Sequence, residues 1–224
     1  LYASNLLTSQ HIWQRIRLAF AEQKSSLTGY LAKRLSSEDR EWVKRWQYAH
    51  RRPTAALKEP WAEEDTALVR DILVHAIGRL ARHKPEQAWK HWQEIAANHA
   101  FTPQQEGEAL HDIALHAALD DHPRAAEWLA SVPDSHADAS IRQWRVRVAL
   151  ANGDWDSALQ SFSRSLELHT VIGDVEGTSE LHGNLGLLQL ERGNVEEAQG
   201  HLNDALQTAK EIGHSFIIGI TYWY

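Results

Sequence analysis

Histidine is the residue type in this chain with the widest chemistry, because 14 are present and an imidazole can bind a metal or move a proton near neutral pH. His111 and His116, with Asp112 beside the first, come closest to a known pattern. A helical zinc motif needs two histidines four residues apart on one face, whereas five residues turn a helix by about 140°. We therefore predict two partly exposed histidines here and no metal site.

A second histidine series recurs every eight residues. Its members are His75, His83, His91 and His99, and Pro85 falls in the middle of the series. Because a proline at this point starts a new helix, the first two histidines and the last two belong to different helices. We interpret the spacing as chance.

Three consecutive carboxylates, Glu63, Glu64 and Asp65, are the candidates for acid–base chemistry. A general acid needs a carboxyl group that burial or a like charge keeps protonated. Acids at a helix start are instead stabilised as anions by the helix dipole, and we expect these to lie near the start of a helix opened by Pro60. The sequence contains no Gly-rich phosphate loop, nucleophile elbow or dinucleotide fingerprint. We predict no catalytic residue and no cofactor.

Basic residues and tryptophans mix between residues 33 and 52, as they do in nucleic-acid-binding grooves. Trp42 and Trp46 are four residues apart, so they share one helix face, which we expect to point to the core. Acidic residues 38, 39 and 41 dilute the positive charge, and we predict no nucleic-acid partner. The cations concerned are Lys33, Arg34, Arg40, Lys44, Arg45, Arg51 and Arg52.

The composition is that of a soluble chain. Its 224 residues include no Cys, which excludes disulfides, thiolate catalysis and Cys-based zinc sites. No stretch approaches the roughly 20 apolar residues that cross a bilayer, and the first seven residues lack the basic start of a signal peptide. We predict no membrane partner and assign no location.

Charge and aromatic content change along the chain. Residues 1–110 hold 16 Lys/Arg and 13 Asp/Glu, a net of +3, whereas residues 111–224 hold 7 and 17, a net of −10. Nine of the ten tryptophans precede residue 156, and Met is absent. These shifts indicate two segments of different origin.

Apolar residues recur at three- and four-residue steps along nearly the whole chain, which predicts helices. The C-terminal third also repeats itself at an offset of 40 residues: Gly153–Ala158 returns as Gly193–Ala198, and Ile172-Gly173 returns as Ile212-Gly213. A fixed period of this size is typical of stacked helix pairs. We predict an all-α fold, a right-handed superhelical solenoid of about twelve helices in antiparallel pairs.

Small residues stand where the two helices of such a pair would approach each other. Asn184-Leu185-Gly186 lies in the first helix, Gly193 at the turn, and Ala198 and Ala205 in the second. The pattern resembles tetratricopeptide repeats, of which residues 155–224 would hold about one and a half, although Gln189 stands where an aromatic is usual.

This resemblance implies a concave groove in which Asn184 would hold the backbone of a bound peptide or protein. The equivalent positions of the neighbouring repeats are Trp144 and Tyr224, so there is no ladder of asparagines. A structural role for Asn184 is the alternative.

Residues 9–160 carry a different resemblance. Ile12–Ala19, Glu106–Ala114 and above all Ile141–Asp154 are similar, in this order, to the superhelical non-catalytic domain of soluble lytic transglycosylases, which are periplasmic enzymes that cleave peptidoglycan. Their lysozyme-like domain has a catalytic Glu followed by Ser, and then a Gly-Leu-Met-Gln segment. Neither feature occurs here, so the resemblance implies no enzyme activity and no site residues.

The two resemblances meet inside one predicted helix near residues 154–170. We therefore interpret residues 1–160 as a transglycosylase-like domain, residues 161–224 as tetratricopeptide repeats, and the whole as a non-catalytic scaffold, an engineered chimera joined through a continuous helix. A natural protein-binding module and a fragment of a lytic transglycosylase are the alternatives.

The last repeat stops partway, and Phe216, Ile217, Ile218, Ile220, Tyr222 and Trp223 would then lack a following helix. An unshielded apolar end of a repeat array favours self-association. A homodimer through this end is the expected consequence.

Overall fold

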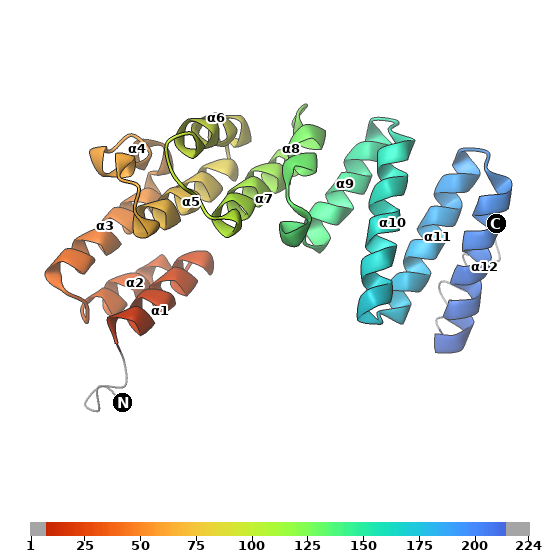
Figure 1. Cartoon of the computed structure of the whole chain (residues 1–224), viewed down its shortest axis with the longest axis horizontal. Coiled ribbons are helices and arrows are strands. Elements are labelled where there is room, and N and C mark those ends of the chain that lie inside the picture. Colours follow the sequence, from red (N-terminus) through yellow and green to blue (C-terminus); the bar gives the residue numbers. More distant parts are fainter. Residues whose placement is uncertain (1–7, 214–224) are drawn as a thin grey trace. The chain divides into compact units, whose positions relative to one another are not determined.

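The computed structural model describes residues 8–213, and over that range the chain is all-α, as predicted. Residues 8–213 form twelve α-helices and two short 3₁₀ helices, with neighbouring helices packed as pairs (Figure 1). None of these helices has both the length and the apolar character that a membrane span needs. The apolar C-terminal segment expected to mediate a homodimer lies outside the described residues.

The chain divides into two compact units between His136 and Ala137. The first unit holds α1 (Ser9–Ala21), α2 (Ser25–Ala32), α3 (Ser37–Arg51), α4 (Pro53–Ala56), η1 (Pro60–Glu63), α5 (Ala67–Ala81), α6 (Pro85–Ala96), α7 (Pro103–Leu119), α8 (Ala125–Ser131) and η2 (Asp134–His136). The second unit holds α9 (Ala139–Ala151), α10 (Trp155–Ile172), α11 (Val175–Glu191) and α12 (Val195–Ile212).

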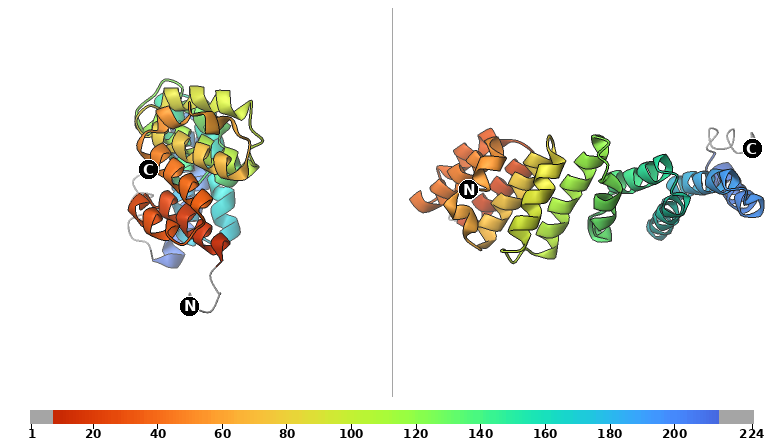
Figure 2. Two further views of the ribbon diagram at one scale, coloured as in Figure 1. Left: turned by 90° about the vertical axis from the view of Figure 1, so that its left-hand side faces the viewer. Right: turned by 90° about the horizontal axis from the view of Figure 1, so that it is seen from above.

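The core of the first unit is built around α5, which packs against α3, α4, α6 and α7 (Figure 2). Its apolar residues Ile72, Leu73 and Ile77 are fully buried. The α1 and α3 helices meet where the rings of Phe20 and Trp46 stack with their centroids 4.7 Å apart. The prediction that Trp46 faces the core is therefore confirmed.

One helix start differs from the sequence expectation. Pro60 opens only the single turn of η1, and α5 begins at Ala67 after a separate N-cap at Thr66. The Thr66 hydroxyl accepts the backbone N–H of Val69 at 3.2 Å. An N-cap threonine satisfies a donor that the first helical turn leaves unpaired, so Thr66 sets the start of α5 where Pro60 was expected to do so.

Glycines with a left-handed backbone conformation occur every 20 residues in the second unit. Gly153, Gly173, Gly193 and Gly213 have φ of +68°, +72°, +80° and +71°, and each stands at the end of a helix. A residue without a Cβ adopts this conformation at little cost, which is why helices commonly end on it. Two such steps make one helix pair, which is the physical origin of the 40-residue period.

The α11 and α12 helices form a close pair. A Cβ on Gly186 would stand 2.7 Å from Cγ of Leu202 and 3.2 Å from the backbone oxygen of Ala198. The hydroxyl of the fully buried Ser179 donates to the backbone oxygen of Ala205 at 2.9 Å. The small residues that suggested a helix pair thus stand where the two backbones approach.

The presence of Gln189 where tetratricopeptide repeats usually have an aromatic residue also has a local explanation. Its side chain is buried, and its Oε1 accepts a hydrogen bond from Nδ2 of Asn194 at 2.9 Å. The amide therefore ties the end of α11 to the turn before α12, where an aromatic ring would only fill space.

The α10 helix is unbroken from Trp155 to Ile172 and packs on both α9 and α11. Ala158 on α10 shares one apolar cluster with Ala149 on α9 and Leu188 on α11. The junction expected near residue 160 is a statement about where two segments of different origin meet. A continuous helix is compatible with such a junction but does not test it, so the junction stays a prediction.

Candidate functional site

The pair His111 and His116 lies on α7, as expected. Nδ1 of His111 is 3.5 Å from Oδ1 of Asp112, and burial lowers the pKa of the half-buried His116. Asp112 also packs over Gly78 of α5, where a Cβ would stand 2.1 Å from Oδ2. The structure therefore gives Asp112 a packing role between α5 and α7, and the prediction of no metal at this pair stays a prediction.

The four histidines at eight-residue spacing have unrelated surroundings. His75 stacks on His50 in the first-unit core, and His99 makes hydrogen bonds with the backbone oxygens of Ile95 and Ala62. Nδ1 of His91 lies 3.1 Å from a carboxylate oxygen of Glu94, and His83 is exposed. The structure does not bring the four side chains together.

Among the carboxylates at residues 63–65, Asp65 is held as an anion. It accepts a hydrogen bond from Arg70 at 2.5 Å and another from the backbone N–H of Ala100 at 3.2 Å. The bond from Arg70, with the smaller contribution of Ala100, lowers the pKa of Asp65. A general acid needs the opposite shift, so this carboxyl group is unsuited to that role.

The two tryptophans of the basic segment are occupied within the fold. Trp46 is buried against Phe20, and Trp42 is half-buried. The guanidinium of Arg45 lies 4.1 Å from the Trp42 ring centroid, and Trp61 contacts the same ring edge-on. Their ring faces are taken by contacts inside the unit rather than offered for stacking on bases.

Asn184 is exposed on α11, at the position predicted to face a peptide groove. Trp144, its equivalent on α9, is half-buried, and the guanidinium of Arg147 lies 5.2 Å from its ring centroid. Both helices pack on α10. Tyr224, the third equivalent position, lies outside the described residues.

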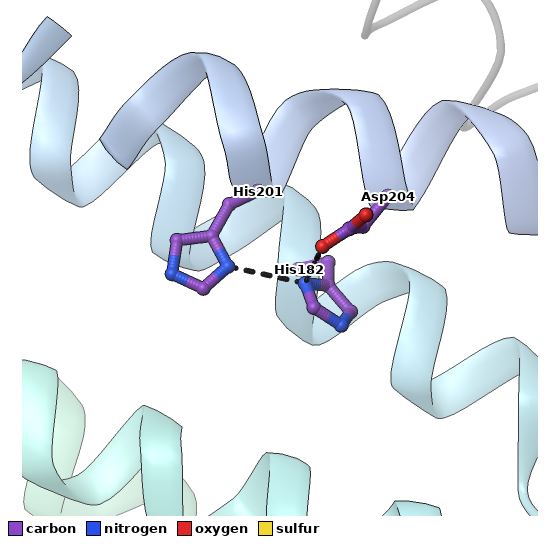
Figure 3. Close-up of side chains that lie close together, drawn as sticks. All are labelled: His182, His201 and Asp204. Carbon is purple, nitrogen blue, oxygen red and sulfur yellow. Dashed lines mark hydrogen bonds and ion pairs between the residues drawn. The ribbon is translucent and has the colours of Figure 1, made fainter. Parts of the chain in front are cut away.

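Three side chains that the sequence analysis did not single out converge between α11 and α12 (Figure 3). His182 comes from α11, and His201 and Asp204 come from α12. The two Nδ1 atoms are 3.1 Å apart, and Nδ1 of His182 is 3.6 Å from Oδ2 of Asp204. One potential ligand atom from each of the three residues lies within 4.8 Å of the other two.

The cluster sits at the edge of solvent. The side chain of His182 is 19% exposed and that of Asp204 is 62% exposed. Burial lowers the pKa of His182, with a further lowering by His201, and the charge of Asp204 opposes this shift. These contributions together favour the unprotonated form of His182, and Asp204 supplies a carboxylate oxygen open to water.

The 40-residue repeat distinguishes these three positions. The preceding repeat has Arg142, Ser161 and Arg164 where this one has His182, His201 and Asp204, so the potential metal ligands occur in one repeat and not in the other. Residues three apart, such as 201 and 204, share a helix face, but a search confined to one helix cannot find a third ligand on its neighbour. The pairing of α11 with α12 is the missing information.

Comparison with known proteins yields a family match and a likeness to a solved structure. Residues 139–211 match the tetratricopeptide repeat family. The fold is similar to that of an inactive mutant of the lytic transglycosylase Slt from Pseudomonas aeruginosa, with a TM-score of 0.71 and 20% sequence identity over 95% of this chain. The chain spans about a third of that enzyme, 35% of its length. Among curated proteins no match was found.

These findings support both sequence resemblances at the level of the fold. The tetratricopeptide match begins at residue 139, inside the block assigned to the transglycosylase-like domain, and it covers all four helices of the second unit. The likeness to Slt covers both units. Residues 139–211 thus match tetratricopeptide repeats, and the chain as a whole has an all-α helical-repeat fold like that of Slt.

Proposed function

We propose that the chain is a non-catalytic helical-repeat scaffold whose second unit binds a segment of another protein. The match of residues 139–211 to tetratricopeptide repeats carries this proposal, because repeats of this class present a face on their first helices to protein partners. In this chain the first helices of the two pairs are α9 and α11.

The contact residues follow from the repeat register. Trp144 on α9 and Asn184 on α11 occupy equivalent positions, and both keep exposed surface. An aromatic ring provides contact area, and the amide provides a donor and an acceptor for a peptide backbone. Arg147, which stacks on Trp144, adds a positive charge to the same part of α9.

A random peptide library displayed on phage, selected against the full chain, tests this function. We expect an enriched motif, and Trp144→Ala or Asn184→Ala to raise its Kd by about tenfold or more, the size of an interface hot spot. Trp155→Ala is the matched control, because Trp155 is a tryptophan 40% exposed on α10, a second helix of a pair. Failure to enrich any motif would contradict the proposed protein binding. Equal Kd values for all three variants would contradict the assignment of Trp144 and Asn184 to the binding surface.

We propose secondarily that two repeat proteins of different origin are joined through α10. The continuous course of α10 across residue 160, and its shared core with α9 and α11, support a join that needs no linker. A natural reading frame that runs uninterrupted across residue 160 would eliminate an engineered fusion.

The remaining alternative is a fragment of a lytic transglycosylase, which the similarity to about a third of Slt supports. Whether the chain is a scaffold or a fragment, we expect it to have no peptidoglycan-cleaving activity of its own. Incubation with purified peptidoglycan should release no soluble fragments, and their release would contradict the non-catalytic assignment.

A further inference from the structure

We propose that His182, His201 and Asp204 form a binding site for a divalent transition-metal ion, held across the α11–α12 pair. The three donors are two imidazole nitrogens and one carboxylate oxygen. This site is separate from the protein-binding residues proposed above and does not depend on that function.

Two of the three distances between the donor atoms are close to an edge of a coordination tetrahedron. Zinc–nitrogen bonds of about 2.0–2.1 Å in a tetrahedron place two ligand nitrogens about 3.3 Å apart. The two Nδ1 atoms are 3.1 Å apart, and Nδ1 of His182 lies 3.6 Å from Oδ2 of Asp204. All three donor atoms lie within 4.8 Å of one another, so rotation of the exposed Asp204 side chain can complete the set around one ion.

The backbone already holds these ligands in position. His201 and Asp204 are three residues apart on α12, so they share a face of that helix. His182 lies on α11 between Ser179, which donates to the backbone oxygen of Ala205, and Gly186, which lies against Leu202. Ligands mounted on two closely packed helices need little ordering when an ion binds.

A hydrogen bond between the two histidines alone does not account for the third residue. One Nδ1–H can donate to the other Nδ1, but 3.6 Å from Nδ1 to the carboxylate is too long for a hydrogen bond. The earlier helix pair has Arg142, Ser161 and Arg164 at these positions, so the repeat itself does not require the cluster. A cation shared by all three donors gives each a partner.

The donor set selects the class of ion. Imidazole suits Zn²⁺, Cu²⁺ and Ni²⁺, whereas Mg²⁺ and Ca²⁺ need mostly oxygen ligands. The exposed Asp204 leaves one side of the site open, so a fourth position would be filled by water.

Isothermal titration of Zn²⁺ into the full chain at pH 7.5 tests the proposal. We expect one site per chain, and His182→Ala, His201→Ala and Asp204→Asn each to raise Kd by at least about tenfold. His83→Ala is the control, since His83 is an exposed histidine of the first unit, and its Kd should equal that of the parent chain. Mg²⁺ at the same concentration should give no heat.

Co²⁺ offers a second readout, because its visible absorption reports the coordination geometry directly. A spectrum with nitrogen and oxygen ligands that disappears in His182→Ala supports the site. If a histidine variant does not fold, as judged by circular dichroism, Asp204→Asn decides, because this largely exposed side chain tolerates substitution. Unchanged Kd and spectrum in the folded variants, or equal loss in His83→Ala, would overturn the proposal.

Discussion

Burial of His75 keeps one imidazole neutral inside the first unit. Its Nε2 lies 3.0 Å from Nδ1 of His50, and the two rings stack with centroids 5.2 Å apart. Desolvation lowers the pKa of His75 to about 3, with further lowering by His50, Arg79 and Arg82, and Asp112 opposes the shift. The protonated form therefore has no favourable place in the folded unit.

This shift predicts an acid-sensitive first unit. An unfolded histidine titrates near pH 6.5, so between pH 6.5 and about 3 the unfolded state binds the extra proton. The free energy of unfolding should decrease as the pH is lowered across that window, by up to about 1.4 kcal/mol per pH unit from His75. Urea unfolding followed by tryptophan fluorescence at pH 7.5, 6 and 5 measures this loss.

His75→Phe should reduce this pH dependence, because the replacement ring cannot bind a proton. His83→Ala, which removes an exposed histidine of the same unit, should leave the dependence intact. An equal slope in all three proteins would assign the acid sensitivity to other groups.

Single residues were the hardest to interpret from sequence. The rejection of a shared ion at His111 and His116 used only the rotation per residue within one helix. The cluster of His182 with His201 depends on which faces α11 and α12 present to each other, and that is set by the close approach at Gly186. Sequence periodicity locates a helix but not its rotation against a neighbour.

At the scale of the helix, two glycines on α11 have opposite roles. A Cβ added to Gly186 would lie 2.7 Å from Cγ of Leu202, whereas a Cβ added to Gly183 meets nothing within 4 Å. Gly in a helix interior costs about 0.5–1 kcal/mol relative to Ala. Only at Gly186 does the close approach of α12 compensate for that cost.

Alanine substitutions should separate these roles. We expect Gly183→Ala to stabilise the second unit by about 0.5–1 kcal/mol. Gly186→Ala should destabilise it by about 1–2 kcal/mol, because overpacking outweighs the same gain in helix propensity. Thermal unfolding followed by circular dichroism measures both, and a stabilised Gly186→Ala chain would contradict the tight α11–α12 contact.

The sequence predicted the positions of helices and turns better than it predicted contacts between side chains. The turns at Gly153, Gly173, Gly193 and Gly213 need left-handed backbone, so they could be placed from residue type and spacing. The start of α5 was missed because Pro60 and Thr66 are both good start signals six residues apart. Only the packing of the intervening turn decides between them.

For the whole molecule, the division between His136 and Ala137 predicts two unfolding transitions, because each unit has its own core. Seven of the ten tryptophans lie in the first unit, so their fluorescence reports mainly on it, whereas circular dichroism reports on helices of both. The two probes should therefore give different urea curves.

Trp128→Ala tests this independence. Trp128 on α8 is fully buried, stacks on Trp89 and His122, and lies under the guanidinium of Arg124 at 4.9 Å. Its indole N–H has no hydrogen-bond partner, so its loss removes ring contacts and no hydrogen bond. We expect a cost of about 3–5 kcal/mol, seen as an earlier fluorescence transition while the second transition by circular dichroism stays in place. Gly186→Ala should move only the second transition. If either variant shifts both transitions together, the units fold as one cooperative array, and the nearest-neighbour coupling of a repeat protein extends across residue 137.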